Sequence, residues 1–326
     1  MSNGTCTITR RTALAALMTP VLGAHAATDF PKQTIRIIAP FNQGAVDILS
    51  RLFAERLTAQ LGVSVVVEQQ TGSGGIIGTN YVTKAAPDGY TLLFTASEPL
   101  IMAPLTLRKP PYDPLKELAP VGKIASSPMI LVASNSAPFR TAEEMVAYAK
   151  KNPGKLAYAS SGPGNPDHFN MERLQEILGF QATNIPYKSS AQKTVDTVAG
   201  HVLVTLLSLA GAQQFLAQKT LRPLAIGSLK RNASLPDVPT MAELTGKSSF
   251  EAGLGYGFFG PARLPADVRD KLYAEIANAL TAPQIASSLV TLGSVPHLLN
   301  SKDYTGELVK SQIESKALVQ RLNLVE

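Results

Sequence analysis

The sequence predicts an α/β protein built as two lobes with a ligand cleft between them. Short apolar, β-branched runs alternate with segments of helical period, and turns rich in Gly, Ser and Asn join them. The same pattern starts again near residue 141, and a long carboxy-terminal stretch follows it. Strand–helix repeats with short connections indicate parallel strands that are covered by helices on both faces.

The elements follow in order along the chain. In the first lobe we expect strands at 34–39, 63–67 and 90–95, with helices at 47–62 and from the glycine-rich turn 71–75 to about 84. Thr141-Ala142-Glu143-Glu144 is a capping box that opens a helix, which Asn152-Pro153-Gly154 ends. Later strands are expected at 156–159, 182–185, 202–206 and 222–226, and later helices at 168–178, 191–199, 266–280 and 302–320.

This order predicts four segments with two crossings between the lobes, near residues 123–132 and 224–228. They are a signal peptide (1–26), the first part of lobe 1 (27–124), lobe 2 (125–226) and a return to lobe 1 (227–326).

The first 26 residues read as a cleavable export signal. Arg10 and Arg11 precede an apolar run at 13–22, and the small-residue triplet at 24–26 predicts cleavage after Ala26. The twin-arginine and the ordinary secretory routes both stay open. A membrane anchor is the weaker alternative, because a span needs roughly 20 apolar residues and this run is about half that. We therefore expect a periplasmic protein with no thiol, since the single cysteine, Cys6, lies in the removed segment.

Composition and motifs argue against most other classes of function. The net charge of +6 is scattered, without long Lys/Arg runs, which argues against nucleic-acid binding. A G-x-G-x-x-G pattern starting at Gly72 fails at Ile77, and no phosphate-binding loop occurs. The mature histidines 168, 201 and 297 lack metal-ligand spacing. We expect no cofactor, no metal and no catalytic residues.

Five turns at the predicted carboxyl ends of strands are the candidate binding elements. Helix N-termini at such turns present unpaired backbone N–H groups that suit anions. Each turn could equally be a plain connection, but five of them in two facing lobes favour a shared cleft. The turns are 40–47, 71–75, 95–98, 160–165 and 186–190.

Several runs resemble the Bug family, the substrate-binding proteins of tripartite tricarboxylate transporters. The most specific are Ala-Ala-Pro-Asp-Gly-Tyr-Thr-Leu-Leu (85–93) and Leu-Pro-Asp-Val-Pro-Thr (235–240). Others lie at 38–41, 72–78, 111–114, 158–162 with His168, and 185–188, in the family's order. The resemblance implies a type II periplasmic-binding-protein fold. It also implies a small organic acid as ligand, membrane permease subunits or a sensor protein as partners, and a carboxylate held by backbone N–H groups and water. We expect a monomer.

The resemblance and the turns together give two walls of predicted ligand-binding residues. One wall comprises Phe41, Asn42, Gly44, Ala45 and Asp47, with Ser97 nearby. The other comprises Ser161, Gly162, His168, Ser189 and Ser208. Asp47 could instead cap a helix, and His168 could instead be a capping or packed histidine.

Three departures from the family pattern bear on specificity. The first turn is one residue shorter, with Asn42 and Gln43 in place of prolines. Leu207 stands where the family commonly has Asp, which favours a less polar or aromatic ligand body. Glu98 stands where a small or neutral residue is usual, and in the cleft it would disfavour a second carboxylate. Two alternatives remain: a sensor or scaffold for signalling, and an exported enzyme acting on a small organic acid.

Overall fold

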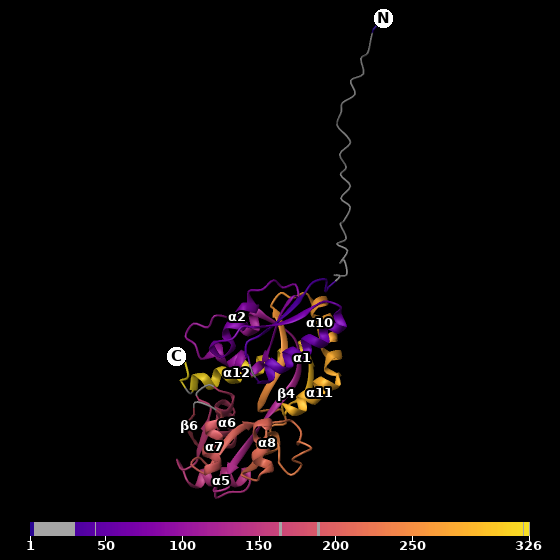
Figure 1. The fold of residues 1–326 in the computed structure, drawn as a ribbon. Coiled ribbons are helices and arrows are strands. Elements are labelled where there is room, and N and C mark those ends of the chain that lie inside the picture. Colours follow the sequence, from indigo (N-terminus) through magenta and orange to yellow (C-terminus); the bar gives the residue numbers. More distant parts are fainter. Residues whose placement is uncertain (3–29, 43, 163–164, 188–189, 322, 326) are drawn as a thin grey trace. The chain divides into compact units, whose positions relative to one another are not determined.

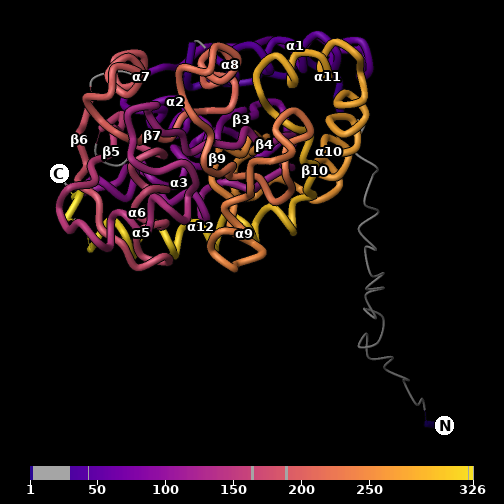
Figure 2. Tube along the Cα trace, turned by 90° about the horizontal axis from the view of Figure 1, so that it is seen from below, coloured from indigo at the N-terminus to yellow at the C-terminus, as the bar shows by residue number. Residues whose placement is uncertain are grey.

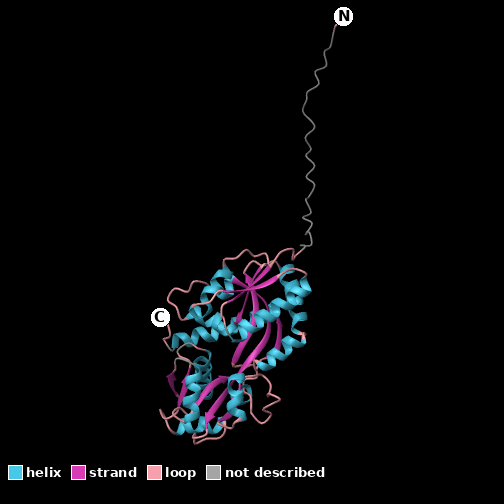
Figure 3. Ribbon diagram, in the orientation of Figure 1, coloured by secondary structure: helices cyan, strands magenta, loops and turns pink. Residues whose placement is uncertain are grey.

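Strands run through the centre of the molecule and helices flank them (Figure 1, Figure 3). The computed structural model describes residues 1–2, 30–42, 44–162, 165–187, 190–321 and 323–325. The predicted signal peptide and Cys6 lie outside the described residues. All elements described below lie in Pro31–Glu326. The strands are β1 (Ile35–Ala39), β2 (Val65–Gln69), β3 (Thr91–Ala96), β4 (Leu118–Ser134), β5 (Ala157–Ser160), β6 (Thr183–Pro186), β7 (Val204–Ser208), β8 (Leu221–Ile226), β9 (Gly253–Pro261) and β10 (Val295–Asn300).

The helices begin and end largely where capping residues and glycines predict. The Thr141 hydroxyl accepts the Glu144 N–H (3.2 Å), while the Glu144 carboxylate accepts the N–H of Arg140. The helices are α1 (Gly44–Leu61), α2 (Ile76–Thr83), α3 (Ser97–Leu105), α4 (Pro114–Glu117), α5 (Ala142–Lys151), α6 (Pro166–Leu178), α7 (Ser190–Ala199), α8 (Leu209–Ala217), α9 (Met241–Thr245), α10 (Ala266–Leu280), α11 (Pro283–Thr291) and α12 (Ser301–Arg321), with a 3₁₀ turn η1 (Ser73–Gly75).

The strands fall into two groups that share β4. In the first group β1 pairs in parallel with β2 and β3, and β9 then lies antiparallel to β3 and to the first part of β4. In the second group β5 pairs in parallel with β6 and β7, while β7 and β8 lie antiparallel to the second part of β4. The predicted parallel strand–helix units are confirmed. The antiparallel strands β4, β9 and β10 add pairing that the sequence pattern did not predict.

Strand β4 changes partners between Pro128 and Met129. Pro128 pairs with Gly253 of β9, and Met129 pairs with Ser208 of β7. The strand therefore passes from the first group to the second without a break in the chain, inside the crossing predicted at 123–132. The division of the chain at residues 124 and 226 into lobes that move separately stays a prediction.

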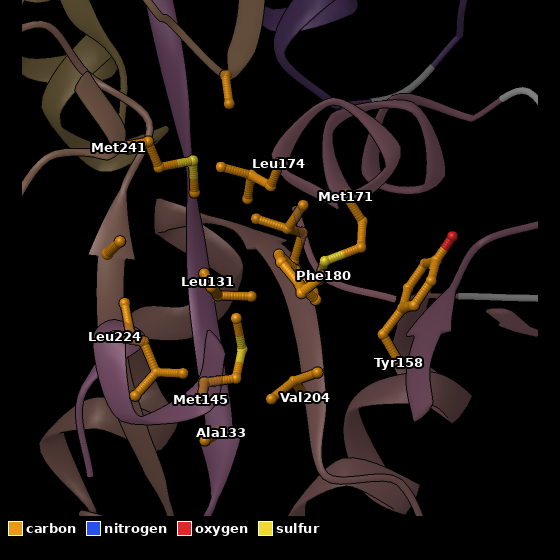
Figure 4. Close-up of a cluster of buried hydrophobic side chains, with 14 of the residues drawn as sticks. Leu131, Ala133, Met145, Tyr158, Met171, Leu174, Phe180, Val204, Leu224 and Met241 are labelled. Carbon is orange, nitrogen blue, oxygen red and sulfur yellow. The ribbon is translucent and has the colours of Figure 1, made fainter. Parts of the chain in front are cut away.

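Each group has its own apolar core. Figure 4 shows one cluster of the second group, in which Leu131, Tyr158, Met171 and Phe180 pack from different elements. A separate cluster on the other face of these strands contains Leu207. Figure 2 shows the corresponding helices, with α7 and α8 on one side and α5 and α6 on the other. Because both faces are covered by helices, the accessible edge of this group is where its strands end.

Candidate functional site

A pocket of about 180 Å³ lies where the strands of the second group end. Helices α6, α7 and α8 directly follow β5, β6 and β7, and the pocket is lined by the first residues of α6 and α7 and by Ser208, the capping residue of α8. Their N-termini bring unpaired backbone N–H groups and partial positive charge to one place. The lining residues are Ser127, Met129, Ser161, Asn165, Pro166, Asp167, Ser190, Lys193, Leu206, Leu207, Ser208 and Leu254. The structure thus brings the predicted residues Ser161 and Ser208 together.

The Ser161 turn is held by a carboxylate that sequence reasoning missed. Asp167 Oδ2 accepts both the backbone N–H (2.7 Å) and the hydroxyl (2.8 Å) of Ser161, and its Oδ1 accepts the N–H of His168 (3.0 Å). Asp167 is only 3% exposed and lies in the first turn of α6, where the helix dipole favours an acid. Both donors of Ser161 are therefore engaged within the protein.

A buried lysine completes this wall. The Lys193 ammonium donates to Asp167 Oδ2 and to the carbonyl of Leu206 (2.8 Å), and the side chain is 2% exposed. Burial lowers the pKa of Lys193, and the neighbouring Asp167 opposes that shift. Lys193 and Thr197, one helical turn apart, both lie on the buried face of α7. The buried residues of α7, namely Lys193, Thr194 and Thr197, are polar, so the apolar pattern along the chain gives no signal for this lysine.

Apolar side chains make up the rest of the pocket wall. Met129, Leu206 and Leu207 are 8%, 1% and 3% exposed, and Leu254 of β9 is half-buried. Leu207 both lines the pocket and packs in the core cluster beside Ile130. The predicted apolar surface at Leu207 is present in the pocket.

A second pocket of about 410 Å³ joins turns from the two strand groups. It is lined by Ser73, Gly74 and Ile76 at the start of α2, by residues of α3, and by Asn165 and Pro166 at the start of α6. Asn165 and Pro166 also line the first pocket, so the two pockets share a wall. Gly74 has a φ of 63°, in the left-handed region that glycine tolerates best. Helix starts from both strand groups therefore surround a shared hollow.

In the third turn, Ser97 is buried and Glu98 faces a separate, charged cavity. The Ser97 hydroxyl is buried and donates to the carbonyl of Gly255 (2.9 Å), whereas Glu98 accepts the N–H of Gly255 (2.9 Å). Glu98 lines a cavity of about 120 Å³ together with Lys123, Glu307 and other charged residues. Burial raises the pKa of Glu98 to about 8, although Lys123 and the Gly255 N–H oppose this shift.

The residues of the predicted first turn do not line either of the two joined pockets. The ring of Phe41 lies against Gly75, where a Cβ would be 3.0 Å from its Cζ atom. Asn42 and Gly44 are exposed and Ala45 is half-buried. Asp47 accepts from Arg51 Nε (3.0 Å) and Gln69 Nε2 (2.8 Å). Helix α1 begins at Gly44, so Asp47 lies inside its first turn and not at its start.

The remaining predicted residues are placed as follows. His168 is 5% exposed, its ring stacks on Tyr158 with centroids 6.3 Å apart, and burial lowers its pKa. Its side chain is packed behind the pocket wall. Gly162 has a φ of 109°, which favours glycine, and its N–H donates to the Ser160 hydroxyl. Ser189 and Gln43 lie outside the described residues.

Among the described residues, no group of three or more His, Cys, Asp or Glu side chains is arranged to hold a metal ion. No helix within the described ranges is long and apolar enough to cross a bilayer.

The mixed α/β fold, with helix N-termini of two strand groups around joined pockets, is that of type II periplasmic solute-binding proteins. The periplasmic binding protein BugD superimposes with a TM-score of 0.67 at 30% identity, covering 91% of this chain and 99% of BugD. The R. palustris protein Rpa4515, solved with adipate, gives a TM-score of 0.71 at 28% identity, covering 90% and 98% of the two chains.

The sequence comparisons identify the family. A model of the tripartite tricarboxylate transporter family receptor matches residues 49–324. A UPF0065 protein from the tcbD-tcbE intergenic region of Pseudomonas sp. strain P51 is 34% identical over 312 residues, which covers 94% of this chain and 92% of that protein. The chain belongs to the tripartite tricarboxylate transporter receptor family, and the predicted Bug resemblance is confirmed.

Proposed function

We propose that this chain is a periplasmic receptor that captures a small carboxylate-bearing molecule for uptake by a tripartite tricarboxylate-type transporter. The observation that carries the proposal is the pair of joined pockets, where helix N-termini from both strand groups meet. Oriented N–H groups and serine hydroxyls suit a carboxylate. The relative solved with adipate supports the same class of ligand.

Capture proceeds by closure of two lobes about the shared strand. Because β4 is continuous through Pro128 and Met129, small changes in its backbone angles would alter the separation of α2 and α3 from α6. The lobes follow the predicted division at residues 124 and 226. Closure would bring the walls of the second pocket together around the ligand and exclude water from the carboxylate.

Membership of the family supports the partners and the cellular location that we propose. The receptor delivers its ligand to membrane permease subunits and works as a monomer. Export uses the segment that ends at Ala26, and cleavage there gives the mature protein. A sensor role without transport is the alternative output of the same binding site. Family receptors and similar solved structures are binding proteins, and this supports a role without covalent chemistry.

A ligand screen on the mature protein tests the proposal. The panel contains aliphatic and aromatic monocarboxylates, dicarboxylates and the matching neutral amides, followed by thermal shift and then by calorimetry. A ligand at one hundred times its Kd should add about 2.7 kcal/mol to the apparent stability. At least one carboxylate should raise Tm when its amide does not. The proposal fails if no member of the panel binds, or if NMR of the incubated mixture shows conversion of the bound acid.

A further inference from the structure

The Asp167–Lys193 ion pair lies in the wall of the first pocket. The acceptor positions of Asp167 are occupied more fully than the donors of Lys193. Asp167 receives four donors, namely the N–H and hydroxyl of Ser161, the N–H of His168 and the Lys193 ammonium. Three of these donors bind Oδ2 and one binds Oδ1, so Oδ2, the oxygen that holds Lys193, is saturated. Lys193 has three N–H donors and uses two, on Asp167 and on the Leu206 carbonyl. Within the described residues, one ammonium N–H is therefore left, and Lys193 lines the pocket.

The surroundings of this donor offer few other strong partners for an anion. Ser161 already donates both its backbone N–H and its hydroxyl to Asp167. The Ser208 hydroxyl accepts the N–H of Gly211 as the cap of α8. Most of the remaining wall is apolar, with Met129, Leu207 and Leu254. An anion in this pocket thus has one charge-assisted donor, weaker hydroxyl and helix-end donors, and an apolar surface for the rest of its body.

We propose that Lys193 supplies the single charge-assisted donor for the ligand, and that the Asp167–Lys193 pair selects monocarboxylates with an apolar body over dicarboxylates. The inference rests on the proposed function and specifies the substrate class of the same site. Asp167 acts as a positioning residue: it fixes the Ser161 turn and holds the ammonium at the end of β7.

Within the described part of the chain, a second ligand carboxylate in the first pocket would find no second charge-assisted donor. Among the described residues that line the first pocket, Lys193 is the one cation, and Asp167 already neutralises part of its field. Placing another carboxylate against Leu207 and Leu254 would remove it from water without a donor to replace the lost hydrogen bonds. The first carboxylate is compensated by the Lys193 ammonium, whereas the second carries the full free energy of desolvation. The pocket therefore discriminates between ligands with one carboxylate and ligands with two.

The test compares the wild type with the double variant Asp167→Asn/Lys193→Met, which removes both charges and keeps similar volumes. The single variant Lys193→Met would leave Asp167 buried without its cation and is expected to unfold more easily. The matched control is Lys123→Met/Glu307→Gln, another pair with a buried lysine (Nζ–Oε1 2.5 Å), which lies in the charged cavity. The probes are benzoate, hexanoate, benzamide and adipate, measured by calorimetry on folded protein.

Wild type and control should bind benzoate or hexanoate at least ten-fold more tightly than adipate. The charge-free double variant should lose at least ten-fold in affinity for these acids and should bind benzamide as the wild type does. The inference is overturned if the folded double variant keeps the wild-type affinity for the acids, or if the wild type prefers adipate. If the wild type binds none of these three acids, the inference is overturned, whereas the proposed function fails only if no carboxylate of the wider panel binds.

Discussion

Replacing Glu98 with glutamine should change how the stability of the protein depends on pH. Burial raises the pKa of Glu98 to about 8 in the folded protein, whereas a glutamate in the unfolded chain titrates at about 4.3. Between these values the folded state holds a proton that the unfolded state has lost. The stabilising contribution is therefore complete at low pH and is lost as the pH rises through about 8.

The size of this effect follows from the shift. Each pH unit well inside the window removes about 1.4 kcal/mol, and this slope halves at the pKa. The free energy of unfolding should therefore fall by at most about 2.3 kcal/mol between roughly pH 6 and pH 8. Water that reaches the half-buried carboxyl through its cavity makes this an upper figure. At about 2.1 cal/mol/K of unfolding entropy per residue, the fall corresponds to at most roughly 4 °C in Tm for a chain of this size. The glutamine variant should lack this component.

The assay is thermal unfolding of both proteins at half-unit steps of pH, with Glu143→Gln on the exposed face of α5 as the control for loss of a surface charge. The difference in Tm between wild type and Glu98→Gln should shift steadily in favour of the variant as the pH rises. The control should run parallel to the wild type. Parallel curves for Glu98→Gln over the same range would show that the carboxyl is not held protonated by its burial.

The remaining predictions concern stability and are read from urea denaturation midpoints. Gly227→Ala should destabilise the fold by about 2–3 kcal/mol, because a Cβ there would lie 1.9 Å from the carbonyl oxygen of Ala252. Gly306→Ala should have the opposite effect, because Gly306 lies in helix α12 at an exposed position with open space around it. The free energy of unfolding should rise by about 0.5–1 kcal/mol, and a fall would contradict this. Thr240→Ala should cost about 1 kcal/mol, since Thr240 and Glu243 form a reciprocal cap on α9; an unchanged midpoint would refute that.

Local patterns predicted the parallel units because each of them is encoded within a few residues. The period of α1, the cap of α5 and the buried run of β3 can each be read from a short stretch of sequence. Strand β4 is different. It is buried over almost its whole length and contains prolines at 120 and 128. Its sequence therefore shows no alternation of apolar and polar residues and does not mark where the strand begins or ends. Its pairing with β9 joins residues more than a hundred positions apart, which no local signal specifies.

The candidate site divides in the same way. Ser161 was predicted because a turn between a strand and a helix is a local feature, whereas Ser208 was predicted from the family resemblance at 206–208; both line the first pocket. Lys193 was missed because a lysine on an amphipathic helix is usually exposed, and its partner lies 26 residues earlier. Only the folded chain brings the two together. Asp167 directly precedes His168 and matches no motif, and its bonds to Ser161 form only in the folded chain.

The Asp167–Lys193 pair changes how the protein can hold an anion. The sequence predicted a grip by free amide hydrogens, yet the best placed of them, the N–H of Ser161, is bound to Asp167. A carboxylate at that point would repel a ligand carboxylate if it stood alone. Lys193 offsets it and keeps one donor for the pocket, so the same aspartate that fixes the turn makes the buried lysine necessary. Removing either charge alone should therefore harm both the fold and the binding, whereas removing both should spare the fold and expose the effect on binding.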